Sequence, residues 1–139
     1  KQNFVKMGSY GIGVSRLVGA IIEAKYNDKD EIMKWPLSVA PYEIGLIPMI
    51  NKNNSLALEK AIKINSILIK NNIDAIIDDT DEAYSSKIKK MNLIGVPYQI
   101  VIGKKSEGNL LEFKETGGET QNLPLETIIN IITTQKVSN

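Results

Sequence analysis

A ten-residue stretch near the start of the chain, GSYGIGVSRL, combines backbone without side chains and a cation. It spans residues 8–17 and places Gly8, Gly11 and Gly13 ahead of Arg16. Glycine allows a flat or bulky ligand to approach the backbone closely, and a planar guanidinium binds phosphate through two parallel hydrogen bonds or stacks on a base. The stretch therefore suits a nucleotide. Taken alone, however, it is more often a turn followed by a surface arginine.

Two widespread nucleotide-binding motifs do not account for this stretch. In the dinucleotide fingerprint G-x-G-x-x-G/A, the last small residue lets the helix pack closely against its strand. Here Arg16 occupies that place after Gly11 and Gly13, and a long charged side chain does not allow such packing. A phosphate loop of the form G-x-x-x-x-G-K-[ST] requires a lysine that the stretch lacks.

Acidic residues gather at a second place, where Asp78-Asp79-Thr80-Asp81 follows the apolar run 75–77. Asp79 and Asp81 have the D-x-D spacing of the magnesium site and aspartyl nucleophile in haloacid-dehalogenase-like phosphatases. However, Ala83 occupies a position where those enzymes usually carry threonine or valine. A loop with solvated acids explains the pattern better than a phosphatase does.

Composition limits the chemistry that the chain could perform. Its 139 residues include neither cysteine nor histidine, which excludes thiolate zinc sites, cysteine nucleophiles and histidine bases. Carboxylates, lysine, arginine, backbone amides and a bound ion remain, and they suffice for adenylyl and phosphoryl transfer. The net charge of +1 provides no overall basic field, so a nucleic-acid site would be a local patch. No apolar run has the length needed to span a bilayer.

The elements that would position these residues follow from hydrophobic periodicity. Residues 3–7 can form a short strand ahead of the glycines, and an apolar stripe from Val14 to Ile22 predicts a one-sided helix that frays near Tyr26. Residues 25–34 read as a polar connection. Trp35-Pro36 and Ala40-Pro41 then favour an extended crossing. The chain begins with Lys1, and we expect it to be a piece excised from a longer protein, with domains at 1–34 and 42–139 and a linker at 35–41.

From Pro41 onward, strands alternate with helices. We expect strands at 44–49, 75–77 and 97–102, a turn at 51–55, and a hairpin of 110–116 and 119–123 around Gly117-Gly118. Helices are expected over 58–69, over 86–93 with a cap at Gly95, and from Pro124 onward. Strand–helix repeats of this length imply parallel strands with right-handed crossovers. The fold class is therefore α/β, a three-layer α/β/α sandwich of about five strands.

The glycine-rich stretch 7–17 resembles motif 3 of class II aminoacyl-tRNA synthetases, in the version found in bacterial prolyl-tRNA synthetases. The resemblance continues in the same order along nearly the whole chain, through Trp35-Pro36, Ala40-Pro41-Tyr42, Leu46-Ile47-Pro48-Met49, Ile77-Asp78-Asp79 and Met91-Asn92-Leu93-Ile94-Gly95-Val96-Pro97. It implies the class II anticodon-binding domain, with a mixed five-stranded sheet of order 2-1-3-4-5 in which strand 4 is antiparallel. A strand–helix remnant of the catalytic domain would precede it.

The resemblance also implies an activity for the parent protein. The parent would be a cytoplasmic, homodimeric proline–tRNA ligase that forms prolyl-adenylate from proline and ATP with Mg²⁺ and then esterifies tRNA. Arg16 would be the catalytic contact to ATP, and Gly11 and Gly13 would line the adenylate site. Because motifs 1 and 2 of the family are absent from these residues, we expect the isolated chain to be inactive and to require no cofactor.

By the same resemblance, the loop and helix after residue 78 would read a proline anticodon. The expected RNA-binding residues are Asp79, Thr80, Glu82, Tyr84 and Lys87. The family usually has Asp-Asp-Arg here, so Thr80 removes a guanidinium contact to a guanine edge, whereas Tyr84 could stack on an unpaired base.

Lysines near this loop allow two interpretations. Lys87 with Lys89, Lys90 and Lys104-Lys105 would form either a phosphate-binding patch or an ordinary solvated face. The alternative function to the ligase fragment is a stand-alone tRNA- or RNA-binding accessory module with the same fold.

Overall fold

The structure is a computed structural model that describes the chain except for residues 1–3, 30–31, 51–55, 104–108 and 139. In the described residues, no helix is long and apolar enough to cross a membrane. The main sheet has five strands in the order β4-β3-β5-β6-β7. These strands are β3 (Ile44–Pro48), β4 (Ala75–Ile77), β5 (Tyr98–Ile102), β6 (Leu110–Glu115) and β7 (Thr120–Pro124).

Strand directions follow from the connections. β3 pairs in parallel with β4 and with β5, and the chain reaches each new strand through a helix. β6 pairs antiparallel with β5 and with β7, and a tight turn joins β6 to β7, with φ of 80° at Gly117. Counted from β3, the order is 2-1-3-4-5 with the fourth strand antiparallel, which confirms the expected topology.

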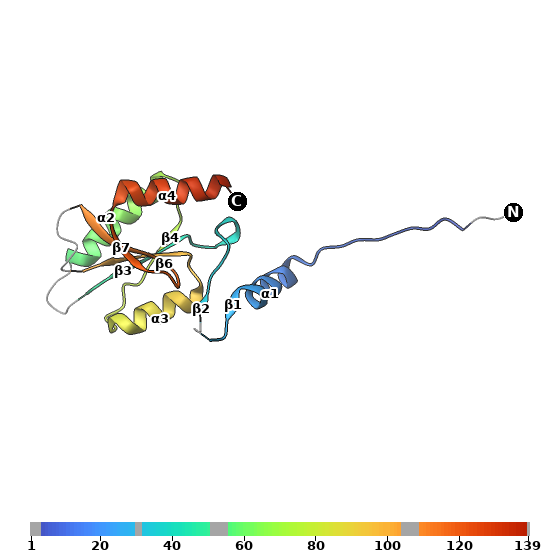
Figure 1. Cartoon of the computed structure of the whole chain (residues 1–139), viewed down its shortest axis with the longest axis horizontal. Helices are drawn as coiled ribbons and strands as arrows, with labels where there is room; N and C mark the ends of the chain where they lie inside the picture. Colours follow the sequence, from blue (N-terminus) through green and yellow to red (C-terminus); the bar gives the residue numbers. More distant parts are fainter. Residues whose placement is uncertain (1–3, 30–31, 51–55, 104–108, 139) are drawn as a thin grey trace.

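Helices cover both faces of this sheet, as Figure 1 shows. α2 (Leu56–Lys70) and α4 (Leu125–Ser138) lie on one face and α3 (Tyr84–Ile94) on the other. The reason is that β4 and β5 lie on opposite sides of β3, so two right-handed crossovers that run in opposite directions place their helices on opposite faces. The three-layer α/β/α sandwich is confirmed.

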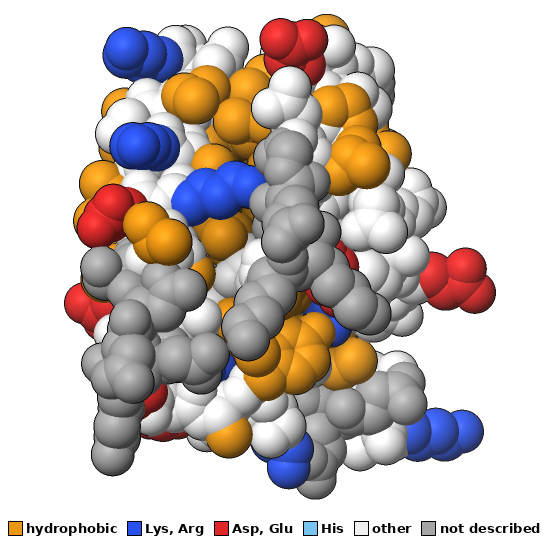
Figure 2. All heavy atoms as spheres, turned by 90° about the vertical axis from the view of Figure 1, so that its left-hand side faces the viewer, with side chains coloured by type: hydrophobic (Ala, Val, Ile, Leu, Met, Phe, Trp, Pro, Cys, Tyr) orange, Lys and Arg blue, Asp and Glu red, His pale blue; other side chains and the backbone are white. Residues whose placement is uncertain are grey.

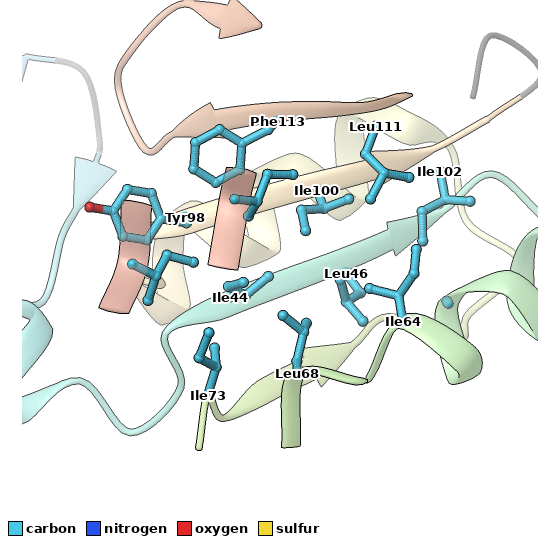
Figure 3. Packing of buried hydrophobic residues seen from close by; sticks show 13 residues of the cluster. Ile44, Leu46, Ile64, Leu68, Ile73, Tyr98, Ile100, Ile102, Leu111 and Phe113 are labelled. Atoms are coloured by element: carbon cyan, nitrogen blue, oxygen red, sulfur yellow. The ribbon is translucent and has the colours of Figure 1, made fainter. Parts of the chain in front are cut away.

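The larger core lies between the sheet and the pair α2 and α4 (Figure 3). The members of this cluster are 0–7% exposed, and they are Ile44, Leu46, Ala61, Ile64, Leu68, Ile73, Tyr98, Ile100, Ile102, Leu111, Phe113, Ile128 and Ile132. A smaller cluster of Ile47, Met91, Val96 and Val101 joins the sheet to α3. Every residue of β3 and β5 is buried, because both strands have a helix on each face and a strand on each side.

Hydrophobic spacing predicts a buried face for each of two helices; its members are Leu125, Ile128, Ile129 and Ile132 in α4 and Leu58, Ala61, Ile62, Leu68 and Ile69 in α2. In α4, Ile128 and Ile132 are buried as predicted, and Pro124 ends β7 one residue before the helix begins. In α2 the buried stripe instead contains Ala61, Ile64 and Leu68, and Ile62 and Ile69 are exposed. The α2 sequence is apolar on two adjacent faces, and only the position of the sheet selects one of them.

The N-terminal arm extends away from the sandwich (Figure 1). α1 (Val14–Lys25) begins where the glycines end, but within the described residues nothing buries its apolar side chains. Residues 4–13 have no regular secondary structure. The expected strand at 3–7 is therefore wrong in its described part, because no described strand lies beside these residues to pair with them.

The connection between the arm and the sandwich is more structured than its polar sequence predicts. β1 (Tyr26–Asn27) pairs antiparallel with β2 (Ile32–Met33), and Met33 is only 4% exposed. The Trp35 indole donates to the carbonyl of Ile94 at 3.0 Å, and the Trp35 amide donates to the carbonyl of Gly95 at 2.9 Å. A 3₁₀ turn at Leu37–Val39 follows. Met33 and Trp35 are thus packed against the end of α3, whereas Leu37 packs against the larger core. The domain limits at 34 and 41 stay a prediction.

Gly95 makes this packing possible. It ends α3 with φ of 82°, in the left-handed region, and an added Cβ would lie 2.7 Å from Met33 Cγ and 2.9 Å from Trp35 Cδ1.

Gly95→Ala should therefore lower the free energy of unfolding of the sandwich by about 2 kcal/mol or more, through backbone strain and overpacking. Urea unfolding followed by Trp35 fluorescence measures the loss. Gly19→Ala is the control, since Gly19 has open space around it on α1; equal midpoints for the two variants would contradict the expectation.

Candidate nucleic-acid interface

The candidate site lies at the edge of the sheet where the parallel strands β3, β4 and β5 have their carboxyl ends. In open α/β sheets, ligands bind at this edge where successive crossovers diverge, and here they diverge on either side of β3. Figure 2 views the molecule from this end and shows basic, acidic and hydrophobic side chains close together. Lys104 and Lys105, which were expected in the basic patch, lie outside the described residues.

Asp78 forms the base of the loop between β4 and α3 and is only 7% exposed. Its Oδ1 accepts hydrogen bonds from the Thr80 amide at 3.1 Å and from the Thr80 hydroxyl at 2.5 Å. Burial opposes the charged carboxylate, but the two Thr80 hydrogen bonds and the nearby ammonium groups of Lys87 and Lys90 outweigh it and lower the pKa of Asp78. Asp78 therefore stays ionised and holds the first turn of the loop.

Glu82 is also held within the chain. One of its carboxylate oxygens accepts from the Ser86 hydroxyl at 2.6 Å and the other from the Lys90 ammonium at 2.5 Å. The bond from Lys90 is the main reason that the pKa of Glu82 is lowered, and the same bond raises the pKa of Lys90. Lys90 also lies 3.9 Å from Asp78 Oδ2. The predicted base contact of Glu82 would thus have to compete with two existing partners.

Lys87 does not lie on the surface. It is 1% exposed, and its ammonium donates to the carbonyl oxygens of Pro48 at 2.9 Å and of Asp78 at 3.1 Å. A phosphate contact requires an ammonium that faces solvent, so this position does not support the predicted phosphate-binding role. Lys89 is exposed on the same helix and is the described lysine of α3 best placed for such a contact.

The exposed members of the predicted set are Asp79, Thr80, Tyr84 and the already paired Glu82. The hydroxyl of Thr80 already donates to Asp78, so it can only accept from a base. Tyr84 begins α3 and is 38% exposed; burial and the nearby Glu112 carboxylate raise the pKa of its phenol, which keeps it neutral at physiological pH. Tyr84 therefore offers a ring face and a neutral hydroxyl at this edge.

Exposed apolar side chains at the same edge were not predicted as part of the site. Met49 follows β3 and Leu110 begins β6, whose start lies beside the end of β5, and they are 40% and 50% exposed. An added Cβ on Gly103, just after β5, would be 3.4 Å from Met49 Cγ. Met49 and Leu110 each lie at the end of an apolar run that the sequence assigns to a strand, so nothing in the pattern marked them as exposed.

The magnesium-phosphatase alternative receives no support. Among the described residues, no group of three or more acidic, histidine or cysteine side chains could hold a metal ion. Asp79 and Asp81 are both exposed. The buried carboxylate of the loop belongs to Asp78, and it already accepts two hydrogen bonds from Thr80.

The glycine-rich stretch forms a second, separate candidate site on the N-terminal arm. Gly13 caps α1, and its carbonyl accepts from the amides of Arg16 and Leu17 at 3.0 and 3.1 Å. The Arg16 side chain lies over Gly13, where an added Cβ would be 3.6 Å from its Cγ and Cδ, and Gly11 has open space around it. Arg16 is exposed and has no ion pair with any described residue. Gly11, Gly13 and Arg16 thus remain accessible to a ligand.

Comparison with known families supports the fold. A family model described as "Anticodon binding domain" matches residues 43–135. Among solved structures, a prolyl-tRNA synthetase from Cryptosporidium parvum complexed with L-proline and AMP matches with a TM-score of 0.76 at 20% sequence identity. The match covers 89% of this chain and 26% of that one, and at this identity it supports the fold alone.

Curated relatives extend the match over the N-terminal arm. A proline–tRNA ligase of Pelagibacter ubique (strain HTCC1062) is 68% identical over 139 residues, which are 100% of this chain and 31% of that protein. A proline–tRNA ligase of Wolbachia sp. subsp. Drosophila simulans (strain wRi) is 44% identical over 135 residues, 94% of this chain and 30% of that protein. The chain therefore spans about a third of the length of these relatives.

The network at Asp78 predicts a pH-dependent stability. The pKa of Asp78 in the folded chain lies below its ordinary value of 3.8. The stabilising contribution of the Asp78 carboxylate to the free energy of unfolding is therefore complete above pH 3.8 and is lost as the pH falls through the folded pKa. Thr80→Ala removes one donor, so it should raise the pKa of Asp78 and lower the free energy of unfolding at pH 7 by about 1 kcal/mol. Urea unfolding as a function of pH and the ¹³C shift of the Asp78 carboxylate check this. Thr133→Ala, exposed on α4, is the control; an unchanged Asp78 titration in Thr80→Ala would contradict the expectation.

Proposed function

Since this chain belongs to the anticodon-binding domain family, we propose that residues 42–139 recognise the anticodon loop of a tRNA that carries a proline anticodon. The observation that carries the proposal is the family match over residues 43–135, whose sheet presents Tyr84 and Asp79 at its carboxyl edge. The identity of 68% to a proline–tRNA ligase supports proline as the amino acid that corresponds to the tRNA.

Single-stranded bases are recognised by stacking on flat side chains and by hydrogen bonds to their edges. In the proposed complex, the Tyr84 ring stacks on one unpaired base, and the exposed carboxylate of Asp79 accepts from a base amino group. Thr80 offers a hydroxyl oxygen as an acceptor. Glu82, bound to Ser86 and Lys90, keeps the loop in shape, and Lys89 contacts phosphate.

The second part of the proposal concerns the protein from which this chain would come. Residues 1–34 belong to the catalytic domain of a proline–tRNA ligase, a cytoplasmic homodimer that uses ATP with Mg²⁺. Gly11 and Gly13 let the adenine nucleotide lie against bare backbone, and the Arg16 guanidinium binds its phosphates. The open space at Gly11 and the exposed guanidinium of Arg16, which forms no ion pair with the described part of the chain, fit this use. In the proposed reaction, a proline carboxylate oxygen bonds to the α-phosphorus of ATP as the bond to the bridging oxygen breaks and pyrophosphate leaves.

The anticodon proposal predicts selective binding by the isolated chain. The chain should bind a tRNA with a proline anticodon more tightly than the same tRNA with that anticodon changed, and Tyr84→Ala should weaken the first complex by about 1–3 kcal/mol through lost stacking. Filter binding or fluorescence anisotropy at several salt concentrations measures both. Each phosphate contact, such as that of Lys89, adds about one unit to the salt slope.

Tyr42→Ala provides a matched control for Tyr84→Ala. Tyr42 is 39% exposed, close to the 38% of Tyr84, but it precedes β3 at the opposite edge of the sheet. Its loss should leave tRNA affinity unchanged. Equal affinity of the wild-type chain for both tRNAs would refute anticodon recognition, and an equal effect of the two tyrosine variants would refute the place of the site.

The isolated chain should not form an adenylate. It matches only 31% of the length of the Pelagibacter relative, and Arg16 alone does not surround a nucleotide and an amino acid. We expect no proline-dependent exchange of pyrophosphate into ATP above the background of a buffer blank, with a full-length proline–tRNA ligase as positive control. Exchange that depends on both proline and this chain would overturn this part of the proposal.

A further inference from the structure

Lys87 occupies the point where the sheet and the proposed RNA-binding loop meet. We propose that Lys87 is a positioning residue: its buried ammonium ties the carboxyl ends of β3 and β4 together and thereby fixes the backbone from which Asp79 and Thr80 project. This inference rests on the proposed anticodon recognition, to which it adds a residue that acts without touching RNA.

The strand pairing explains why an ammonium is needed at this point. The parallel ladder between β3 and β4 ends with the Asp78 amide, which donates to the Leu46 carbonyl at 3.0 Å. Because ladder hydrogen bonds recur every second residue, the next one would run from the amide of Thr80 to the carbonyl of Pro48. That amide instead donates to the side chain of Asp78, so the loop leaves the sheet at this step.

The Lys87 ammonium takes the place of the missing ladder donor. It donates to the Pro48 carbonyl at 2.9 Å and to the Asp78 carbonyl at 3.1 Å, and thus connects the two strands just where their own pairing ends. A buried charge costs free energy unless it is paired and hydrogen-bonded, and Lys87 is 1% exposed. An apolar side chain of the same length would leave both carbonyl oxygens without this donor.

The tie continues from the backbone into the loop. Lys87 donates to the backbone carbonyl of Asp78. The side-chain carboxylate of the same Asp78 accepts two hydrogen bonds from Thr80. Lys90 then connects Asp78 to Glu82, and Ser86 donates to the second oxygen of Glu82. Fixing Asp78 therefore fixes both ends of the segment 78–82. The exposed Lys89 has no such connection to the strands among the residues that the structure describes.

Lys87→Met tests the proposal, because methionine keeps an unbranched apolar side chain that is shorter by only the terminal atom and removes the ammonium. We expect the ratio of affinities for the matched and the changed anticodon to fall about tenfold, which corresponds to 1.4 kcal/mol. We also expect the Thr80 amide to lose protection from hydrogen exchange while the amides of β3 and β5 keep theirs. Lys87→Arg, which retains a cation and donors, should recover part of both the ratio and the Thr80 protection.

Lys89→Met is the matched control on the same helix. It should weaken binding of both tRNAs by the same factor and leave Thr80 protection unchanged. A folded Lys87→Met chain that keeps its affinity ratio and its Thr80 protection, or one that behaves like Lys89→Met, would overturn the proposal. A purely structural role would lower the protection of β3 and β5 together with that of Thr80, which would also overturn it.

Two further observations keep the test decisive. Should Lys87→Met fail to fold, the wild-type chain is examined by NMR: the Lys87 ammonium protons must exchange slowly and show couplings to the carbonyl carbons of Pro48 and Asp78, and their absence would overturn the tie. If the wild-type chain binds both tRNAs equally, the proposal of anticodon recognition fails. The positioning role of Lys87 is then judged by hydrogen exchange alone: the Thr80 amide should keep its protection in Lys87→Arg and lose it in Lys87→Met.

Discussion

The parallel pairing of β3 with β4 is short, and its early end shapes the candidate interface. β3 runs to Pro48, but the register with β4 extends only from Ile44↔Ala75 to Leu46↔Ile77. Its pairing with β5 continues two residues further, to Pro48↔Ile102. On the β4 side of β3, the Pro48 carbonyl therefore lacks a ladder donor while the β5 side is still paired. The buried ammonium of Lys87 donates to this carbonyl and to that of Asp78, and the chain after Asp78 can leave the sheet.

Charge is distributed around this junction in two layers. Asp78 and Lys87 lie inside, and Glu82 and Lys90 lie above them near the surface. The inner groups hold the backbone, because buried hydrogen bonds to charged groups are stronger than exposed ones. The outer pair is exposed and contributes little to stability. This division leaves Asp79 and Tyr84 exposed toward a ligand, whereas Asp78, Glu82 and Lys87 are engaged within the chain.

A second polar network fixes the opposite edge of the sheet. Glu43, only 6% exposed, accepts from the amide of Asp74 at 2.7 Å and pairs with Lys136 of α4. Lys136 also donates to the carbonyl of Asn72 at 2.6 Å, where φ of 56° turns the chain from α2 toward β4. The amino-terminal edge is thus closed by structural contacts, and the carboxyl edge keeps exposed polar and aromatic groups.

The sequence by itself determined the five strands and three helices of the sandwich and their order, but it missed β1 and β2 and predicted a strand at 3–7 that the described residues do not form. Alternation of apolar runs with one-sided helices implied parallel strands, and the residues 117–118 marked the hairpin, because these signals are local and each element carries its own. The resemblance also located the loop 78–82. The tertiary structure decided which residues of that loop are exposed and can contact a ligand. It buried Lys87 and Met33, which look like surface residues in a polar segment, and it chose Ile64 over Ile62 in α2. Burial depends on neighbours that come from distant parts of the chain, and no spacing within a segment reports where those neighbours will lie.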